Sequence, residues 1–162
     1  MKSEETKNSQ DFLETNERFL EFKLGKEMYA IPLLSVKEVI SPPETTSIPN
    51  SPDYFIGIMN LRGQLITVVD LRKRMAIKPA EDSHENAVVI VNIENIQIGM
   101  MVDSIHKVLQ FHVEKDMQVL PEVSERKSHA YMKGIFKAED RLIVLLDLAK
   151  ILNIYDLKKM AS

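Results

Sequence analysis

The sequence predicts an all-β fold made of two related halves, and three observations support this prediction. The segment GIMNLRGQLITVVDLRK, which begins at Gly57, returns 77 positions later as GIFKAEDRLIVLLDLAK from Gly134, with seven identities in seventeen aligned positions. A fainter match precedes it, because AIPLLSVKEVI from Ala30 aligns with GMMVDSIHKVL from Gly99. Short β-rich segments recur without long helical segments between them, which favours small barrels or a sandwich over an α/β sheet.

The length and composition allow one cooperative domain. The chain has 162 residues, of which 44% are hydrophobic, and this lies within the usual size of a single domain. Two barrels of about 60 to 70 residues would each be marginally stable alone. We therefore expect the halves to share a hydrophobic core, with a groove at their junction as the default binding site.

Several classes of function lack the residues they need. No cysteine is present, and the four histidines have no metal-ligand spacing, so we expect no disulfide, no metal and no cofactor. Nucleotide-binding and hydrolase motifs are also missing, which argues against an enzyme. The net charge of −3 gives no broad basic field. Without a signal peptide or an apolar run of 18 residues, the chain is expected to be cytoplasmic.

The first half is predicted to contain two hairpins separated by a stiff loop. Residues 1–18 are polar and aperiodic, which is typical of a flexible tail. Four prolines between positions 41 and 52 predict a rigid surface loop. Asp70 is expected to cap a short helix over residues 71–75. Strands are predicted over residues 19–24, 28–31, 36–40, 57–61 and 65–71, with a helical turn at 33–35.

The second half repeats this plan after a polar link at residues 78–86. Apolar residues at 151, 152, 154, 157 and 160 predict an amphipathic C-terminal helix. The first barrel is accordingly placed at about 19–78 and the second at about 86–152, with residues 153–162 as a C-terminal helix or tail. Strands are predicted over residues 87–93, 96–103, 104–111, 134–137 and 141–148.

Two charged features have a structural and a functional interpretation. Asp70 and Asp147 occupy equivalent places, and we interpret them as helix caps rather than as a catalytic acid and base. The basic cluster Arg72-Lys73-Arg74 is interpreted as the solvated face of a helix. The alternative is a small barrel that binds nucleic acid, although the aromatic residues do not interleave with this cluster as such binding requires.

The sequence offers more than one role for one arginine and for three glycines. Arg62 heads a hairpin turn, where it would serve solubility or grip the Glu38 carboxylate with its fork. Gly57, Gly99 and Gly134 stand at strand positions, where a missing side chain allows either a barrel bend or close approach by another backbone. Repetition favours the bend at Gly57 and Gly134. For Gly99, the choice between a bend and close backbone contact stays open.

The first repeated hairpin resembles the signature hairpin of the CheW family. The residues that carry the resemblance run from Gly57 to Gly63 and from Leu65 to Arg72, together with YAIPLLSVKEVI and AVVIVNIENIQIGMMVDSIHKVL in the family's order. The resemblance covers residues 19–152. It implies two SH3-like five-stranded β-barrels that share a core. No kinase core precedes residue 19 and no receiver domain follows residue 152, so it implies a single-domain adaptor.

The resemblance also implies partners and site residues. CheW proteins are non-catalytic adaptors that join the histidine kinase CheA to the cytoplasmic tips of chemoreceptors. The first barrel would dock on the regulatory domain of CheA, and the groove between the barrels would accept the helical receptor hairpin. The resemblance further implies a Glu38–Arg62 salt bridge. The implied binding residues, to which Ile40 is added as an apolar groove residue, are Val36, Glu38, Ile40, Gly57, Arg62, Gly63, Gly99 and Val108.

The second hairpin departs from the family pattern at its turn. Lys137-Ala138-Glu139-Asp140 replaces the NLRG turn, so only the first hairpin is expected to have that turn's recognition role. We also expect the apolar groove to be lined by Val36, Ile40 and Val108 around Gly99. On this hypothesis Gly99→Asp weakens receptor binding and leaves the fold intact.

Overall fold

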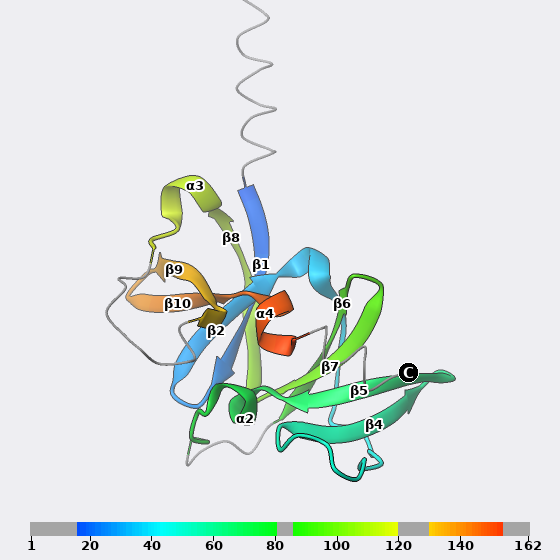
Figure 1. Ribbon diagram of the computed structural model, residues 1–162. Coiled ribbons are helices and arrows are strands. Elements are labelled where there is room, and N and C mark those ends of the chain that lie inside the picture. Colours follow the sequence, from blue (N-terminus) through cyan, green and yellow to red (C-terminus); the bar gives the residue numbers. More distant parts are fainter. Residues whose placement is uncertain (1–15, 81–85, 120–129, 154–162) are drawn as a thin grey trace, which may run out of the picture.

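A computed structural model describes residues 16–80, 86–119 and 130–153 (Figure 1). It confirms the all-β class. Four short helices are defined within the described residues, of which three lie between strands and one follows the last strand. The strands are β1 (Asn16–Leu24), β2 (Glu27–Pro32), β3 (Val36–Ile40), β4 (Phe55–Leu61), β5 (Gln64–Asp70), β6 (Ala87–Ile93), β7 (Ile96–Val102), β8 (Ser104–His112), β9 (Met132–Ala138) and β10 (Arg141–Leu146). The helices are η1 (Leu33–Ser35), α2 (Leu71–Met75), α3 (Val113–Asp116) and α4 (Leu148–Leu152).

The strands form two five-stranded sheets, and each sheet combines strands from both halves of the sequence. Barrel A has the order β8-β1-β2-β10-β9, and barrel B has the order β3-β6-β7-β5-β4. Parallel pairing of β2 with β10 and of β5 with β7 joins the halves. The division of the barrels at residues 19–78 and 86–152 was therefore wrong, because the chain leaves barrel A after β2 and completes barrel B first.

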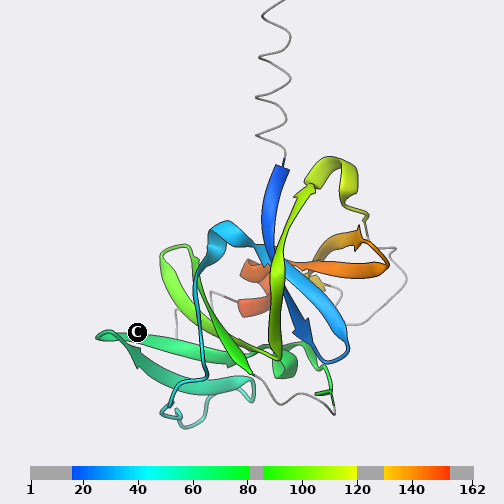
Figure 2. The same cartoon turned by 180° about the vertical axis from the view of Figure 1, so that it is seen from behind.

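The repeat in the sequence becomes a pseudo-two-fold relation between the barrels. Residues of β1–β3 correspond to residues 69 positions later in β6–β8, and residues from β4 to α2 correspond to residues 77 positions later in β9 to α4. Replacing every strand by its counterpart converts the strand order of barrel A into that of barrel B. Each barrel therefore closes with three strands of one half and two of the other (Figure 2).

Alternate residues of the central strands enter different cores, which explains their continuous apolar runs. On β1, Leu20, Phe22 and Leu24 belong to a large shared core that also receives side chains from barrel B and from α2 and α4. This confirms the expectation that the two halves share a hydrophobic core. The barrel A interior contains Phe19, Ala30, Phe136, Ile143 and Leu145. The barrel B interior contains Met59, Ile66, Val68, Val88 and Ile90.

The two equivalent aspartates cap the two equivalent helices, as predicted. Asp70 accepts hydrogen bonds from the backbone N–H groups of Arg72 and Lys73, and Asp147 accepts one from that of Lys150. The C-terminal helix differs from the prediction, since α4 ends at Leu152 and Asn153 adopts a left-handed conformation with φ 44°. A continuous helix from residue 151 is therefore wrong, and residues 154–162 lie outside the described residues.

The basic cluster on α2 is not a solvated face. Arg74 donates from Nε to the carbonyl of Ile151 at 2.6 Å, and its guanidinium lies 4.8 Å and 5.0 Å from the ring centroids of Tyr54 and Tyr131. The Arg72 side chain is largely buried and forms ion pairs with Asp70 and Asp103. Of these three residues of the cluster, only Lys73 is exposed. The two arginines instead connect α2 to the rest of the protein.

The predicted tail needs one adjustment at its end. Residues 16–18 belong to β1, whose first residues pair with β8. Residues 1–15 lie outside the described residues.

Candidate interaction surface

Glu38 and Arg62 form a two-pronged ion pair on barrel B. Arg62 donates from Nη1 to Glu38 Oε1 at 2.9 Å and from Nη2 to Oε2 at 3.0 Å, so the expected pair is confirmed. Glu38 lies on β3 and Arg62 in the β4–β5 turn, which means that the pair connects the two edges of the barrel B sheet. Hydrogen bonding to Glu38, and next its charge, raises the pKa of Arg62. The fork therefore remains charged.

The turn that presents Arg62 is locally fixed. Arg62 has φ 52° and Gly63 has φ 85°, which suits a two-residue hairpin turn with a glycine at its second position. The side-chain oxygen of Asn60 accepts a hydrogen bond from the Gly63 N–H at 2.9 Å. Gly63 therefore supplies the backbone conformation that places the guanidinium beside Glu38.

Gly57 allows a loop to close the same edge of barrel B. The backbone groups of Thr46 and Ile58 exchange two hydrogen bonds of 2.8 Å, and a Cβ on Gly57 would overlap the Thr46 carbonyl. Gly57 has φ 154°, and the pairing of β4 with β5 shifts register between Phe55 and Gly57. The favoured bend is therefore present at this glycine, and the alternative of close approach by another backbone is present as well.

Gly134 repeats this arrangement in barrel A. A Cβ there would lie 2.6 Å from Met117 Cγ and 2.8 Å from the Gln118 carbonyl oxygen. Gln118 and Ile135 exchange two backbone hydrogen bonds of 2.9 Å. The repeated glycine thus admits a loop strand in both barrels.

We predict that Gly57→Ala destabilises the fold by about 2–4 kcal/mol, which combines backbone strain of about 1–3 kcal/mol with weakening of two hydrogen bonds. The control is Gly63→Ala, because a Cβ there meets nothing within 4 Å and only the left-handed conformation costs about 1–2 kcal/mol. Urea unfolding measures both values, and hydrogen exchange at Thr46 and Ile58 locates the change. Equal costs at the two glycines would contradict the role of close approach.

Gly99 is buried in barrel B and does not line a surface. A Cβ on Gly99 would point into the barrel B interior, 3.0 Å from Val88 Cγ1 and 3.4 Å from Val68 Cγ2. Its counterpart Ala30 has the same place in the barrel A interior. The expected groove around Gly99 is therefore wrong, because both faces of β7 are covered.

The apolar residues of the predicted groove have three different environments. Val36 packs against the shared core and Ile40 against the barrel B interior, because a register shift between Val36 and Glu38 separates them on β3. Val108 is exposed on β8, the edge strand of barrel A. The other seven predicted site residues belong to barrel B and its β4–β5 turn.

Comparisons with known proteins agree with this architecture. A family model described as the CheW-like domain matches residues 18–155. The chain belongs to the CheW family. It is 31% identical to "Chemotaxis protein CheW" of Treponema pallidum over 87% of this chain and 85% of that protein, and 31% identical to "Chemotaxis protein CheW" of Klebsiella aerogenes over 85% and 82%. The crystal structure of the scaffolding protein TtCheW from Thermoanaerobacter tengcongensis is similar with a TM-score of 0.75 and 32% identity, covering 83% of this chain and 91% of that one.

Among the exposed apolar residues of this CheW-family chain, sequence reasoning missed Leu65, Leu142 and Val39, whereas Val108 was one of the predicted site residues. Leu65 on β5 is 75% exposed and its counterpart Leu142 on β10 is 62% exposed. Val39 and its counterpart Val108 are also exposed on edge strands. Repetition was the available signal, because a leucine and a valine are identical at these positions in both halves. Leu65 and Val39 therefore join the Glu38–Arg62 pair as candidate contact residues of barrel B.

Charge distinguishes the two barrels of this CheW-family fold. The counterpart of Glu38 is Lys107 and the counterpart of Arg62 is Glu139, so the signs are exchanged. Within residues 16–80, 86–119 and 130–153, the ion pairs include Glu38 with Arg62 but none between Lys107 and Glu139. The rigid fork thus belongs to barrel B, as the altered turn of the second hairpin suggested.

Two further features bear on chemistry. In the part of the chain that the structure describes, no three histidine or acidic side chains come close enough together to hold a metal ion. His84 and His129 lie outside that part. Among the described helices, none has the length and apolar character needed to cross a membrane.

Proposed function

We propose that this protein is a non-catalytic adaptor that couples the cytoplasmic tips of chemoreceptors to the histidine kinase CheA in bacterial chemotaxis arrays. The observation that carries the proposal is the exposed Glu38–Arg62 fork between the edges of barrel B, in a chain that belongs to the CheW family. The ion pair already holds the two long side chains in one conformation. A partner therefore does not have to immobilise them when it binds, which avoids part of the entropic cost of binding. Such an adaptor works in the cytoplasm and reaches the membrane through its protein partners.

Barrel B is the proposed docking surface for the regulatory domain of CheA. Val39, which follows Glu38 on β3, and Leu65, near the start of β5 after the turn that contains Arg62, supply exposed apolar area on the same barrel as the charged fork. Apolar residues within a polar rim are a common composition for protein interfaces. The junction between the barrels is the proposed site for the helical hairpin of a receptor. Its lining differs from the predicted one because Gly99 is buried within barrel B.

Nucleic-acid binding receives no support from the arrangement of charge. Binding a phosphate backbone needs cations that are free to contact it. Arg72 is paired with Asp103 and Arg74 packs between two tyrosines. The basic cluster that motivated this alternative is therefore occupied within the protein.

The test is a binding experiment with purified components. We expect Arg62→Ala to weaken binding to the CheA regulatory domain by about tenfold or more, because Glu38 loses its partner and the turn is no longer tied to β3. Calorimetry with the parent, Arg62→Ala, Glu38→Gln and the double variant gives the coupling between the two residues. The fold should be retained, since the pair is at the surface.

The matched control is Lys73→Ala, which removes an exposed positive charge from α2. Its affinity should equal that of the parent. If Arg62→Ala bound both the kinase domain and a receptor fragment with parental affinity, the proposed surface would be refuted. Salt-sensitive binding of single-stranded DNA that is lost in Lys73→Ala would favour the nucleic-acid alternative.

A further inference from the structure

Asp103 is the single residue between β7 of barrel B and β8 of barrel A. The chain therefore crosses from one barrel to the other within one residue. The Asp103 N–H donates to the carbonyl of Lys23 on β1 at 3.0 Å, and its side chain is only 3% exposed. A buried carboxylate at a crossover requires partners, because burying an unpaired charge is costly.

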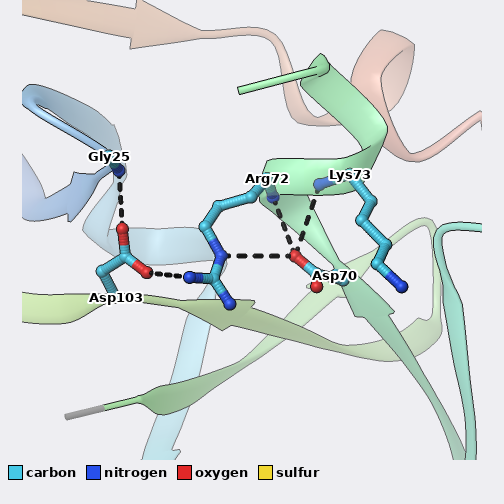
Figure 3. Close-up of polar contacts among 5 residues, drawn as sticks. All are labelled: Gly25, Asp70, Arg72, Lys73 and Asp103. Carbon is cyan, nitrogen blue, oxygen red and sulfur yellow. Dashed lines mark hydrogen bonds and ion pairs between the residues drawn. The ribbon is translucent and has the colours of Figure 1, made fainter. Parts of the chain in front are cut away.

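The partners of the Asp103 carboxylate come from different barrels (Figure 3). Its Oδ2 accepts a hydrogen bond of 2.6 Å from the Gly25 N–H, in the β1–β2 turn of barrel A. Its Oδ1 lies 2.8 Å from Nη1 of Arg72 on α2, which continues β5 of barrel B. The carboxylate thus bridges a hairpin turn of one barrel and a helix of the other.

Arg72 is held in place for this bridge. Its side chain is 14% exposed, and its Nε lies 3.7 Å from Asp70 Oδ1, the same oxygen that caps α2 (Figure 3). The hairpin turn also packs directly on the segment after α2, because a Cβ on Gly25 would lie 2.8 Å from Ile77 Cγ2. Together Asp70, Arg72, Asp103 and Gly25 connect the end of β5 to the β1–β2 turn.

The pseudo-two-fold counterpart lacks this bridge. Asp103 corresponds to Leu34 and Arg72 corresponds to Ala149, and neither counterpart has a charge. Leu34 is fully exposed in η1, which carries the chain from β2 of barrel A to β3 of barrel B. One of the two crossovers is therefore held by a buried carboxylate that accepts a hydrogen bond from the Gly25 N–H and forms an ion pair with Arg72, whereas the other crossover has no charged residue at the equivalent positions.

We propose that Asp103 and Arg72 are positioning residues that fix the angle between the barrels. The shared core holds the barrels together, but apolar attraction is non-directional and specifies an angle weakly. A buried ion pair contributes little net stability yet demands one geometry. Because η1 leads directly into β3, a change of angle also moves Glu38. The consequence for partner binding rests on the proposed adaptor function.

The experiment measures the angle itself in the full chain, without a partner. The chain has no cysteine, so two introduced cysteines are the only sites for spin labels. Asn92→Cys on β6 and Lys137→Cys on β9 place one exposed label on each barrel. Arg18→Cys with Lys137→Cys places both labels on barrel A and is the control pair. Distances are measured by pulsed electron resonance in the parent, in Asp103→Asn and in Arg72→Gln.

We expect both variants to broaden and shift the distance distribution between the barrels while the barrel A pair is unchanged. Asp147→Ala, which removes the cap of α4 but leaves the crossover intact, should change neither distribution although it lowers the melting temperature. The same broadening in Asp147→Ala, or parental inter-barrel distances in both Asp103→Asn and Arg72→Gln, would overturn the proposal.

Calorimetry then tests the consequence for binding. A receptor fragment at the barrel junction should bind Asp103→Asn and Arg72→Gln more weakly than the parent, whereas Asp147→Ala should bind as the parent does. Parental binding by broadened variants would overturn the positioning role. If the parent itself binds no receptor fragment, the proposed function fails. The distance measurements still show whether Asp103 and Arg72 fix the angle between the barrels.

Discussion

Gly99→Asp is expected to leave the protein unfolded or marginally folded, with a loss of at least about 4 kcal/mol at pH 7. The new side chain would enter the barrel B interior among Val88, Val68 and Ile90, where no charged partner is available from these side chains. Protonating an aspartate with an ordinary pKa of about 3.9 at pH 7 costs about 4 kcal/mol, and burying the neutral acid without hydrogen bonds adds to this. The whole free energy of unfolding of a domain of this size is about 5–15 kcal/mol.

Gly99→Ala is the matched control for this variant. Its methyl group meets a flexible valine side chain at 3.0 Å rather than backbone, and the counterpart Ala30 has such a methyl group in the other barrel. We expect a change within about 1 kcal/mol, since slight overpacking is offset by a less flexible unfolded chain. Chemical unfolding of both variants decides the matter. A fully folded Gly99→Asp protein that only lost receptor binding would restore the surface hypothesis.

The repeat in the sequence was sufficient to predict the strands but not their partners. Alternation of apolar and polar residues reports which faces are buried, and it placed the hairpins and the two aspartate caps correctly. Strand pairing depends on which chain segments cross between barrels. The crossovers are as short as Asp103 alone, and their sequence gives no indication of direction. The interchange of strands between the halves could therefore be seen only in three dimensions.

The candidate site was partly predictable for a related reason. Glu38 and Arg62 both belong to hydrophilic positions at the edges of one sheet, where a fork has room to form. Gly99 was misplaced because β7 is covered on both faces, so that no alternation separates its inward side from an outward one. The partners of Arg72 were missed because ion pairing between distant segments leaves no pattern in the sequence.

Arg141→Met is expected to cost about 3–5 kcal/mol, because it leaves Glu21 without its main partner in the barrel A interior. Glu21 is fully buried on β1, between residues that enter the shared core. Its carboxylate receives hydrogen bonds of 2.7 Å and 3.4 Å from Nη1 and Nη2 of Arg141. Without Arg141, the nearest charge-bearing group given for the buried carboxylate among the described residues is His106, whose Nε2 lies 4.0 Å from Glu21 Oε2. This longer contact compensates the buried charge poorly, and urea unfolding measures the penalty.

The second barrel supplies the control for this prediction. The counterpart of Glu21 is Ile90, which fills the same place in the barrel B interior without any ion pair. We therefore expect Glu21→Ile combined with Arg141→Met to recover parental stability, or to exceed it by about 1–4 kcal/mol, since apolar packing often replaces a buried pair without loss. If the double variant were as unstable as Arg141→Met alone, the arginine's packing rather than the stranded carboxylate would be the cause. Recovery would mean that the two barrels reach the same fold with a charged interior in one and an apolar interior in the other, so the pair is not required for folding.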